Sequence, residues 1–104
     1  MPWPAAKLNA VATVLVDGEN VRRSLWPNMA RDELERRAAA WGAANGHEVV
    51  VVWESSESAD DTIARQVREL EPPLWVATSD RELRGRVADH VERVVGGGSF
   101  ARQL

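Results

Sequence analysis

The sequence predicts an α/β fold in three layers, in which helices cover both faces of a small, mostly parallel, four-stranded sheet. Short apolar runs alternate with amphipathic segments along the chain, in the order β-α-β-α-β-α-β. The first run lacks the polar alternation of a half-exposed strand, which is typical of strands covered on both faces. Parallel strands joined in this order require right-handed crossovers, so we expect helices on both sides of the sheet.

Length and composition fit one compact domain. The chain has 104 residues, of which we expect residues 1–9 to form an N-terminal leader and residues 10–104 a single domain. The formal net charge of -3 is unlike that of a strongly basic nucleic-acid binder, although it is compatible with a nuclease whose acids surround a metal. The absence of cysteine excludes disulfides and thiolate metal sites, and two histidines are too few for a histidine-built zinc site.

The location is expected to be cytoplasmic, with no membrane partner. No segment approaches the length of a membrane span, and the start lacks the positive and then apolar order of a signal peptide. The short fourth strand leaves a sheet edge at which two copies could pair, so a homodimer stays open.

The first strand is expected at residues 11–16, followed by an Asp-Gly turn. Asn20 is a typical N-cap residue for a short helix, which Pro27 ends. A longer helix begins at residue 28 or 29, because Leu34, Ala38 and Trp41 recur at helical spacing. The Asn-Gly pair that follows supplies a left-handed stop.

The second strand is expected at residues 48–53, and a short polar link leads into a third helix. Ile63, Val67 and Leu70 form its buried face, and the proline pair at 72–73 prevents its continuation. The third strand is expected at residues 74–78.

In the fourth helix, Ser79 is the expected N-cap residue and Glu82 completes a capping box. The last strand covers residues 92–95 and ends in three glycines, after which we expect no adequate helix. Trp41, Trp53 and Trp75 are expected in the core from their spacing.

Acidic residues stand where a parallel sheet would bring them together. Asp17 follows the first strand, Asp80 follows the third, and Asp60 and Asp61 open the third helix. If the first strand is central, the chain reverses direction between strands one and three and opens a crevice at their carboxyl ends, where ligands bind in such sheets. We therefore expect these acids to meet at one edge.

Helical periodicity refines this expectation. Asp60 lies three positions before Ile63, and Asp80 lies three positions before Leu83, so both acids occupy a first helical turn on the side facing the sheet. Asp61 lies about 100° further round the helix, so it points to solvent or serves as an outer member of the site.

Carboxylate oxygens are the ligands that Mg²⁺ and Mn²⁺ prefer, so the sequence predicts a divalent-metal site. Asp17, Asp60 and Asp80 are the candidate catalytic residues and metal ligands, with Asp61 as a further ligand. Each acid alone also has a structural explanation as a turn or helix-capping residue. Capping does not explain why all of them should converge.

Three segments resemble the NYN domain, a branch of the PIN-like nucleases, and within it the YacP-like group. VLVDGENV at 14–21 resembles the opening strand with its Asp-Gly-x-Asn turn, SADDTIA at 58–64 the Ala-Asp-Asp-x-Ile helix start, and ATSDREL at 77–83 the Thr-Ser-Asp-Arg segment. GGSF at 97–100 is similar to a small-residue closing segment. The motifs occur in the family's order and span most of the chain.

The resemblance implies a metal-dependent ribonuclease, expected to be an endoribonuclease, that hydrolyses RNA phosphodiester bonds by in-line attack of water. It implies metal-binding or catalytic roles for the aspartates above, with Mg²⁺ or Mn²⁺ as cofactor, and a contact of Asn20 with an acid or a phosphate. The short link at 54–57 replaces a longer insertion in the family, which leaves two alternatives: a reduced reach toward RNA, or a reach supplied by a ribosome or protein partner.

Polar residues near these acids are candidates for binding RNA. Ser79 and Arg81 at a helix start could hold a neighbouring phosphate. The candidates for gripping the RNA backbone are Arg22, Arg23, Arg84 and Arg86. The alternative for these arginines is a solvated helix face paired with Glu82 and Asp89. Trp26 could stack a base, although packing in the core or against Pro27 is the favoured interpretation.

Two rival functions remain. A non-catalytic RNA- or protein-binding module would have the same fold, but clustered carboxylates repel phosphate unless a cation is present. Another α/β protein with an acidic site is less consistent, because a phospho-receiver domain needs a late lysine and the only lysine here is Lys7. A dehalogenase-type phosphatase needs Asp-x-Asp after the first strand, where this chain has Asp17-Gly18-Glu19.

Overall fold

A four-stranded parallel sheet in the order β2-β1-β3-β4 forms the centre of the protein. It is seen in a computed structural model that describes residues 12–104. The central strand β1 pairs with β2 on one side and β3 on the other, as predicted. The strands are β1 (Thr13–Asp17), β2 (Glu48–Val52), β3 (Leu74–Ala77) and β4 (Arg93–Val95).

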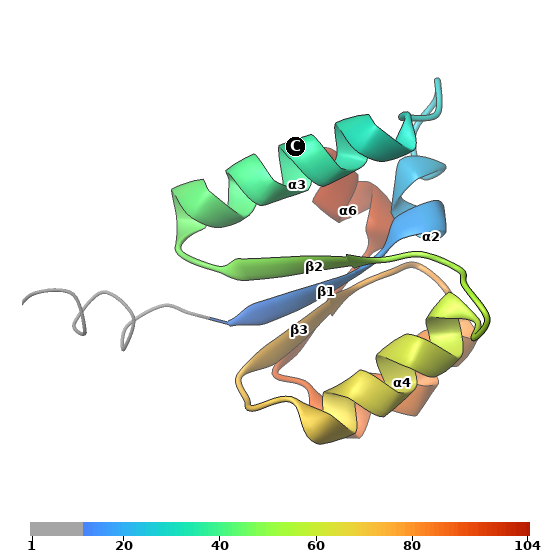
Figure 1. Cartoon of the computed structure of the whole chain (residues 1–104), viewed down its shortest axis with the longest axis vertical. Coiled ribbons are helices and arrows are strands. Elements are labelled where there is room, and N and C mark those ends of the chain that lie inside the picture. Colours follow the sequence, from blue (N-terminus) through green and yellow to red (C-terminus); the bar gives the residue numbers. More distant parts are fainter. Residues whose placement is uncertain (1–11) are drawn as a thin grey trace, which may run out of the picture.

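Helices cover both faces of this sheet, which confirms the three-layer α/β fold (Figure 1). One face carries α2 (Gly18–Arg22), α3 (Arg31–Asn45) and α6 (Gly97–Ala101). The other carries α4 (Ala59–Glu69) and α5 (Arg81–Val87), which continues into the 3₁₀ turn η1 (Ala88–His90). No helix of the described residues is both long enough and apolar enough to cross a membrane.

The core is divided into two apolar clusters by the sheet. Along β1, Leu15 packs with the helices on the α4 side, while Val14 and Val16 pack on the α3 side. Successive strand side chains point to opposite faces, so a buried central strand needs apolar residues at every position. This is why the first apolar run shows no polar alternation.

Two predicted helix caps are wrong. Helix α2 begins directly after Asp17, so Asn20 lies inside the helix rather than at its cap. Helix α5 is capped by Asp80, whose Oδ1 accepts from the backbone N–H of Leu83 at 3.0 Å. The Ser79 hydroxyl oxygen instead accepts from the backbone N–H of Gly97 at 2.7 Å. In both cases the side chain is used by a contact distant in sequence.

No adequate helix was expected after the three glycines, because a short glycine-rich segment has a low helix propensity, but the structure has helix α6 there. Its helix is stabilised by tertiary packing, since Phe100 is fully buried against the sheet. The predicted left-handed stop of α3 is confirmed at Gly46, with a φ of 73°.

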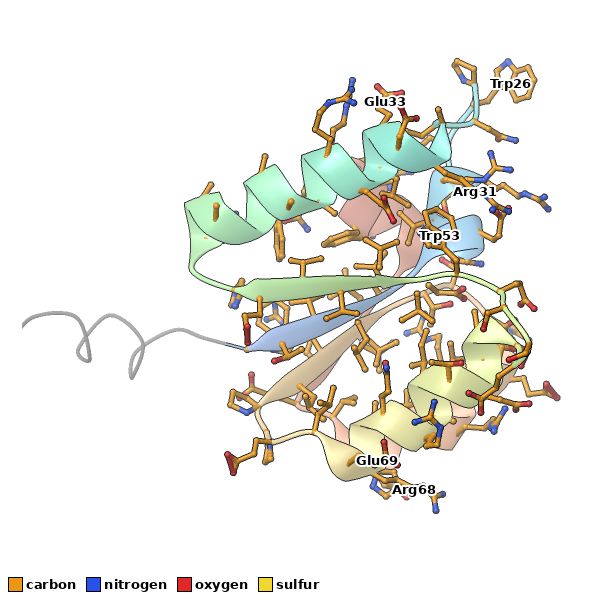
Figure 2. All side chains as sticks on the ribbon, viewed as in Figure 1. Trp26, Arg31, Glu33, Trp53, Arg68 and Glu69 are labelled. Carbon is orange, nitrogen blue, oxygen red and sulfur yellow. The ribbon has the colours of Figure 1, made fainter. Side chains whose placement is uncertain are left out.

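Several apolar residues are more exposed than expected. Trp26 is 89% exposed in the connection between α2 and α3 (Figure 2). Leu70 is 39% exposed, so neither residue belongs to the core. The other three predicted core tryptophans are half-buried at its margin. Their indole N–H groups reach surface acceptors, which explains why they are not fully enclosed. The pairs are Trp41 with Gln103, Trp53 with Glu35, and Trp75 with Glu92.

His47 connects the starts of two strands. Its ring lies between Trp41 and Trp75, with ring centroids at 5.4 and 4.6 Å, and its Nδ1 accepts from the backbone N–H of Ala12 at 3.2 Å. The place of His47 in a loop after the end of a helix did not predict this packing. The predicted leader at 1–9 lies outside the described residues.

Two helical glycines predict opposite effects of alanine. A Cβ at Gly42 in α3 would lie 2.8 Å from the backbone oxygen of His47, which cannot move freely, whereas a Cβ at Gly85 in α5 has no atom within 4 Å. We expect Gly42→Ala to lower the free energy of unfolding by about 1–3 kcal/mol through overpacking. Gly85→Ala should raise it by about 0.5–1 kcal/mol by restricting the unfolded chain. Urea denaturation of both variants checks this; equal signs would contradict it.

Candidate active site

Five carboxylates line a pocket of about 450 Å³ at the carboxyl edge of the sheet, and one of them, Glu19, is bound to arginines. The other four come from the end of β1, the β2–α4 link, the first turn of α4 and the cap of α5. The four are Asp17, Glu54, Asp60 and Asp80. Segments far apart in the sequence therefore bring like charges to one place, at the edge where open α/β sheets bind ligands.

Asp17 is the most enclosed of the four, with 5% of its surface exposed. Burial raises the pKa of its carboxyl group above the ordinary value of 3.8, and the hydrogen bond from Thr78 opposes this shift. The negative charges of Asp60, Asp80 and Glu54 raise the pKa further. Ionisation of the Asp17 carboxyl group is therefore less favourable in the folded protein than in the unfolded chain.

The Thr78 hydroxyl links two of the acids. It donates to Asp17 Oδ2 at 2.8 Å, and its oxygen accepts from the backbone N–H of Asp80 at 3.1 Å. Thr78 is fully buried, so both contacts are shielded from water. The sequence alone predicts no role for Thr78. A hydroxyl at the end of a buried strand could have indicated a polar contact at the pocket.

Asp60 lies half-buried in the first turn of α4, on the side facing the pocket as expected. Its pKa is raised, first by burial and then by the nearby charge of Asp80, while Arg86 acts in the opposite direction. The neighbouring Glu54 carboxylate adds to the increase. Burial and nearby negative charge therefore raise the pKa values of both Asp17 and Asp60.

Glu54 is not among the predicted site residues. Its Oε1 accepts from the backbone N–H of Ala59 at 3.2 Å, which caps α4 beside Ser58 and holds the carboxylate at the pocket. The rule that identified Asp17 and Asp80, an acid placed just after a strand, would also have found Glu54 after β2.

Asp61 is not brought to this pocket. Its side chain is exposed and forms an ion pair with Arg86 at 3.0 Å, on a separate part of the surface that Arg65 and Arg68 also line. The pKa of Asp61 is lowered by this arginine and by the Ser58 hydroxyl. Asp61 therefore differs from the four pocket acids in position and in charge environment.

The predicted RNA-binding residues fall into different places. Asn20 lines the pocket, and its Oδ1 accepts from the backbone N–H of Ser79 at 2.8 Å, which ties α2 to the β3–α5 turn. Arg22 is bound to Glu19 at 3.0 Å. Arg81 and Arg84 are exposed on α5 and do not line the pocket.

The chemistry of the donor set fits a hard divalent cation, because all four side chains supply carboxylate oxygens. Within residues 12–104, however, no group of three acidic or histidine side chains is close enough to hold one ion directly. Asp17 and Asp80 each also use one oxygen in a hydrogen bond. These acids therefore suit an ion that keeps several of its waters, as Mg²⁺ commonly does.

Comparison with known proteins supports the fold. No protein-family model matches the chain, and no curated protein matches it. Among solved structures, a mutant of Rae1 (YacP) from Bacillus subtilis is similar, with a TM-score of 0.75 and 23% sequence identity. The similarity covers 88% of this chain and 72% of that chain, which shows that the two share a fold.

The raised pKa of Asp17 predicts a pH-dependent cost in stability. A group whose folded pKa exceeds 3.8 favours the fold at lower pH, and this contribution declines as the pH rises through the folded pKa. Asp17→Asn cannot ionise and keeps an oxygen for Thr78. We expect the variant to have a higher free energy of unfolding than wild type at pH 7, with the gain disappearing toward pH 3.

Asp61→Asn is the matched control for this measurement. The lowered pKa of Asp61 contributes stability above 3.8 that is lost as the pH falls through the folded pKa, so its removal should destabilise the fold at pH 7. Urea denaturation of both variants between pH 3 and 8 measures the two effects. An Asp17→Asn variant that is less stable than wild type at pH 7 would contradict the prediction.

Proposed function

We propose that this protein is a divalent-metal-dependent ribonuclease that hydrolyses RNA phosphodiester bonds, acting as an endoribonuclease. The observation that carries this proposal is that four carboxylates from four separate segments line one pocket, beside the arginine-bound Glu19. Such a group of like charges costs stability, as the raised pKa values of Asp17 and Asp60 indicate, so a functional reason is expected. A bound cation supplies one.

Support for RNA as the substrate comes from the sequence motifs and the fold together. The three motifs at 14–21, 58–64 and 77–83 resemble the YacP-like nucleases, and the fold is shared with Rae1 (YacP). Each motif contributes at least one acid to the pocket: Asp17 and Glu19 from the first, Asp60 from the second and Asp80 from the third. RNA as substrate also favours action in the cytoplasm, with the ribosome or another protein as a partner.

The pocket acids would hold Mg²⁺ or Mn²⁺, which when bound activates a water and neutralises charge on the scissile phosphate. In this proposal Asp17, Asp60 and Asp80 hold the ion partly through its bound waters, with Glu54 as a fourth acid beside it. Thr78 fixes the Asp17 carboxylate and the Asp80 turn by its two hydrogen bonds. Because Thr78 is buried, water does not compete for these contacts.

A non-catalytic RNA- or protein-binding module of the same fold is the second candidate. One observation favours it: no three acids within the described part of the chain lie close enough to hold an ion directly. A binding module would retain the pocket without cleaving a strand. Metal binding and cleavage therefore have to be measured separately.

Cleavage of a labelled RNA in Mn²⁺, Mg²⁺ and EDTA tests the proposal, using wild type and Asp60→Asn. We expect wild type to cleave only with metal, and Asp60→Asn to lose at least about 10²-fold in rate, the usual effect of removing one electrostatic group from an active site. The matched control is Asp89→Asn, which removes an exposed carboxylate on η1. It should cleave as wild type does.

Mn²⁺ binding measured by calorimetry or electron paramagnetic resonance gives a readout independent of cleavage. Wild type should bind Mn²⁺, and Asp17→Asn and Asp60→Asn should bind it more weakly. Metal binding without cleavage of any RNA would reject the ribonuclease. Failure of wild type to bind either metal would reject the metal site itself.

A further inference from the structure

The connection between α2 and α3, residues 23–30, projects from the body of the protein next to α2 (Figure 1). Its base is closed by a backbone hydrogen bond from Met29 to Arg22 at 2.9 Å and by Arg22 Nη1 donating to the Met29 oxygen at 3.3 Å. Trp26 lies in the middle of this loop and is 89% exposed (Figure 2). The loop thus exposes the large indole of Trp26 to solvent, outside the core.

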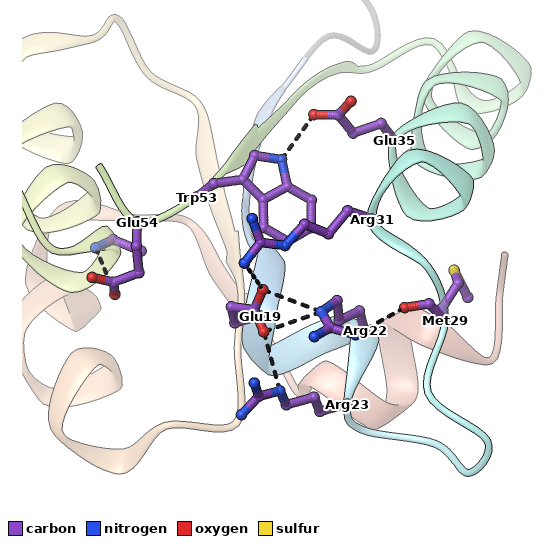
Figure 3. Close-up of polar contacts among 9 residues, drawn as sticks. Glu19, Arg22, Arg23, Met29, Arg31, Glu35, Trp53 and Glu54 are labelled. Atoms are coloured by element: carbon purple, nitrogen blue, oxygen red, sulfur yellow. Dashed lines mark hydrogen bonds and ion pairs between the residues drawn. The ribbon is translucent and has the colours of Figure 1, made fainter. Parts of the chain in front are cut away.

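The two ends of this loop carry arginines bound to one carboxylate. Glu19 contacts Arg23 Nε at 3.1 Å and Arg31 Nη2 at 2.7 Å, in addition to Arg22 at 3.0 Å (Figure 3). Three guanidinium groups around one carboxylate leave an excess of positive charge. Each guanidinium has five N–H donors, so a single contact with Glu19 leaves donors for another anion.

The exposures of the arginines distinguish their roles. The Arg22 side chain is 20% exposed and closes the loop, whereas Arg23 and Arg31 are 63% and 61% exposed and accessible to a ligand. The guanidinium of Arg31 also lies 5.1 Å from the centroid of the Trp53 ring, whose Nε1 donates to Glu35 at 2.8 Å. These contacts orient Arg31, which lowers the entropy cost of binding an anion.

We propose that Arg23, Arg31 and Trp26 form a subsite for one nucleotide of a single-stranded nucleic acid, with a phosphate on the arginines and a base stacked on Trp26. A ligand that suits both features must combine negative charge with an exposed planar ring. Single strands have this combination, and duplexes bury their bases. The choice of RNA rests on the proposed function.

The position of the subsite connects it to the acid pocket. Glu19 and Arg23 line the pocket themselves, so a strand whose scissile phosphate lies at the carboxylates can continue onto the loop. The two groups of charges then have different ligands, because the acids are suited to a cation and the arginines to the neighbouring backbone phosphate. The subsite thereby selects unpaired strands over duplexes, and the proposed function makes unpaired RNA the substrate class.

Fluorescence anisotropy with a short, labelled, single-stranded RNA in EDTA tests the subsite without strand cleavage. Trp26→Ala should weaken binding about tenfold, within the range measured for loss of one base–aromatic stack. An oligonucleotide with abasic positions should lose this dependence on Trp26. Single-stranded DNA of the same sequence should show it, because stacking does not require the 2′-hydroxyl.

The arginines have a separate readout. Arg31→Gln should weaken RNA binding and reduce the slope of log affinity against log salt by about 0.7, the value for one phosphate contact on a single strand. Arg31→Lys should restore the slope, because it keeps the charge. Melting temperatures of the variants show whether each protein is folded at the assay temperature.

Two control variants remove comparable groups elsewhere. Leu70→Ala deletes another exposed apolar side chain, and Arg68→Gln removes an exposed charge at the far end of α4 (Figure 2). Both should bind RNA within about twofold of wild type, because neither side chain lies near the loop or the acid pocket.

The subsite is rejected if Trp26→Ala binds single-stranded RNA as wild type does, or if its loss of affinity is the same with duplex or abasic strands. Absence of any RNA binding by wild type also rejects it. A protein that binds RNA through Trp26 and Arg31 but cleaves no RNA in Mn²⁺ supports the subsite and rejects the ribonuclease. The two proposals therefore fail by different results.

Discussion

The hydrogen bond from the buried Thr78 hydroxyl to the Asp17 carboxylate is the interaction on which the acid pocket depends. A carboxylate at the end of a central strand loses its water, and the hydroxyl replaces part of that hydration. The same oxygen receives the Asp80 backbone N–H, so one side chain sets the spacing between β1 and the start of α5. A low local dielectric strengthens both contacts.

Charge is arranged around this centre in two zones. The pocket concentrates carboxylates, and the adjoining face of α2 and α3 concentrates guanidinium groups around Glu19. The pKa of Glu19 is lowered, first by its hydrogen bond with Arg22 and also by Arg31, so this carboxylate keeps its charge to a lower pH than a free glutamate does. Opposite charges placed side by side suit a complex of a cation and a polyanion, because each zone has its own partner.

The sequence could predict the fold and much of the pocket because both follow from periodicity. Uninterrupted apolar runs indicated the strands, helical spacing placed Asp60 and Asp80 on the inner faces, and strand order brought Asp17 beside them. Glu54 lies just after β2, so the rule that an acid after a strand lies at this edge could also have predicted it. The order β2-β1-β3-β4 agrees with a central first strand and right-handed crossovers on either side of it.

The errors have a common physical cause, which is competition from contacts distant in sequence. Ser79 has the composition of an N-cap, but its hydroxyl is taken by Gly97, and the side chain of Asn20 is taken by Ser79. Helix α6 has little propensity of its own and depends on burying Phe100. This helix also has a consequence for biosynthesis. Until its segment leaves the ribosome, a nascent chain lacks the Gly97 N–H that donates to the Ser79 hydroxyl, so the β3–α5 turn beside the pocket cannot be completed before α6 has been synthesised.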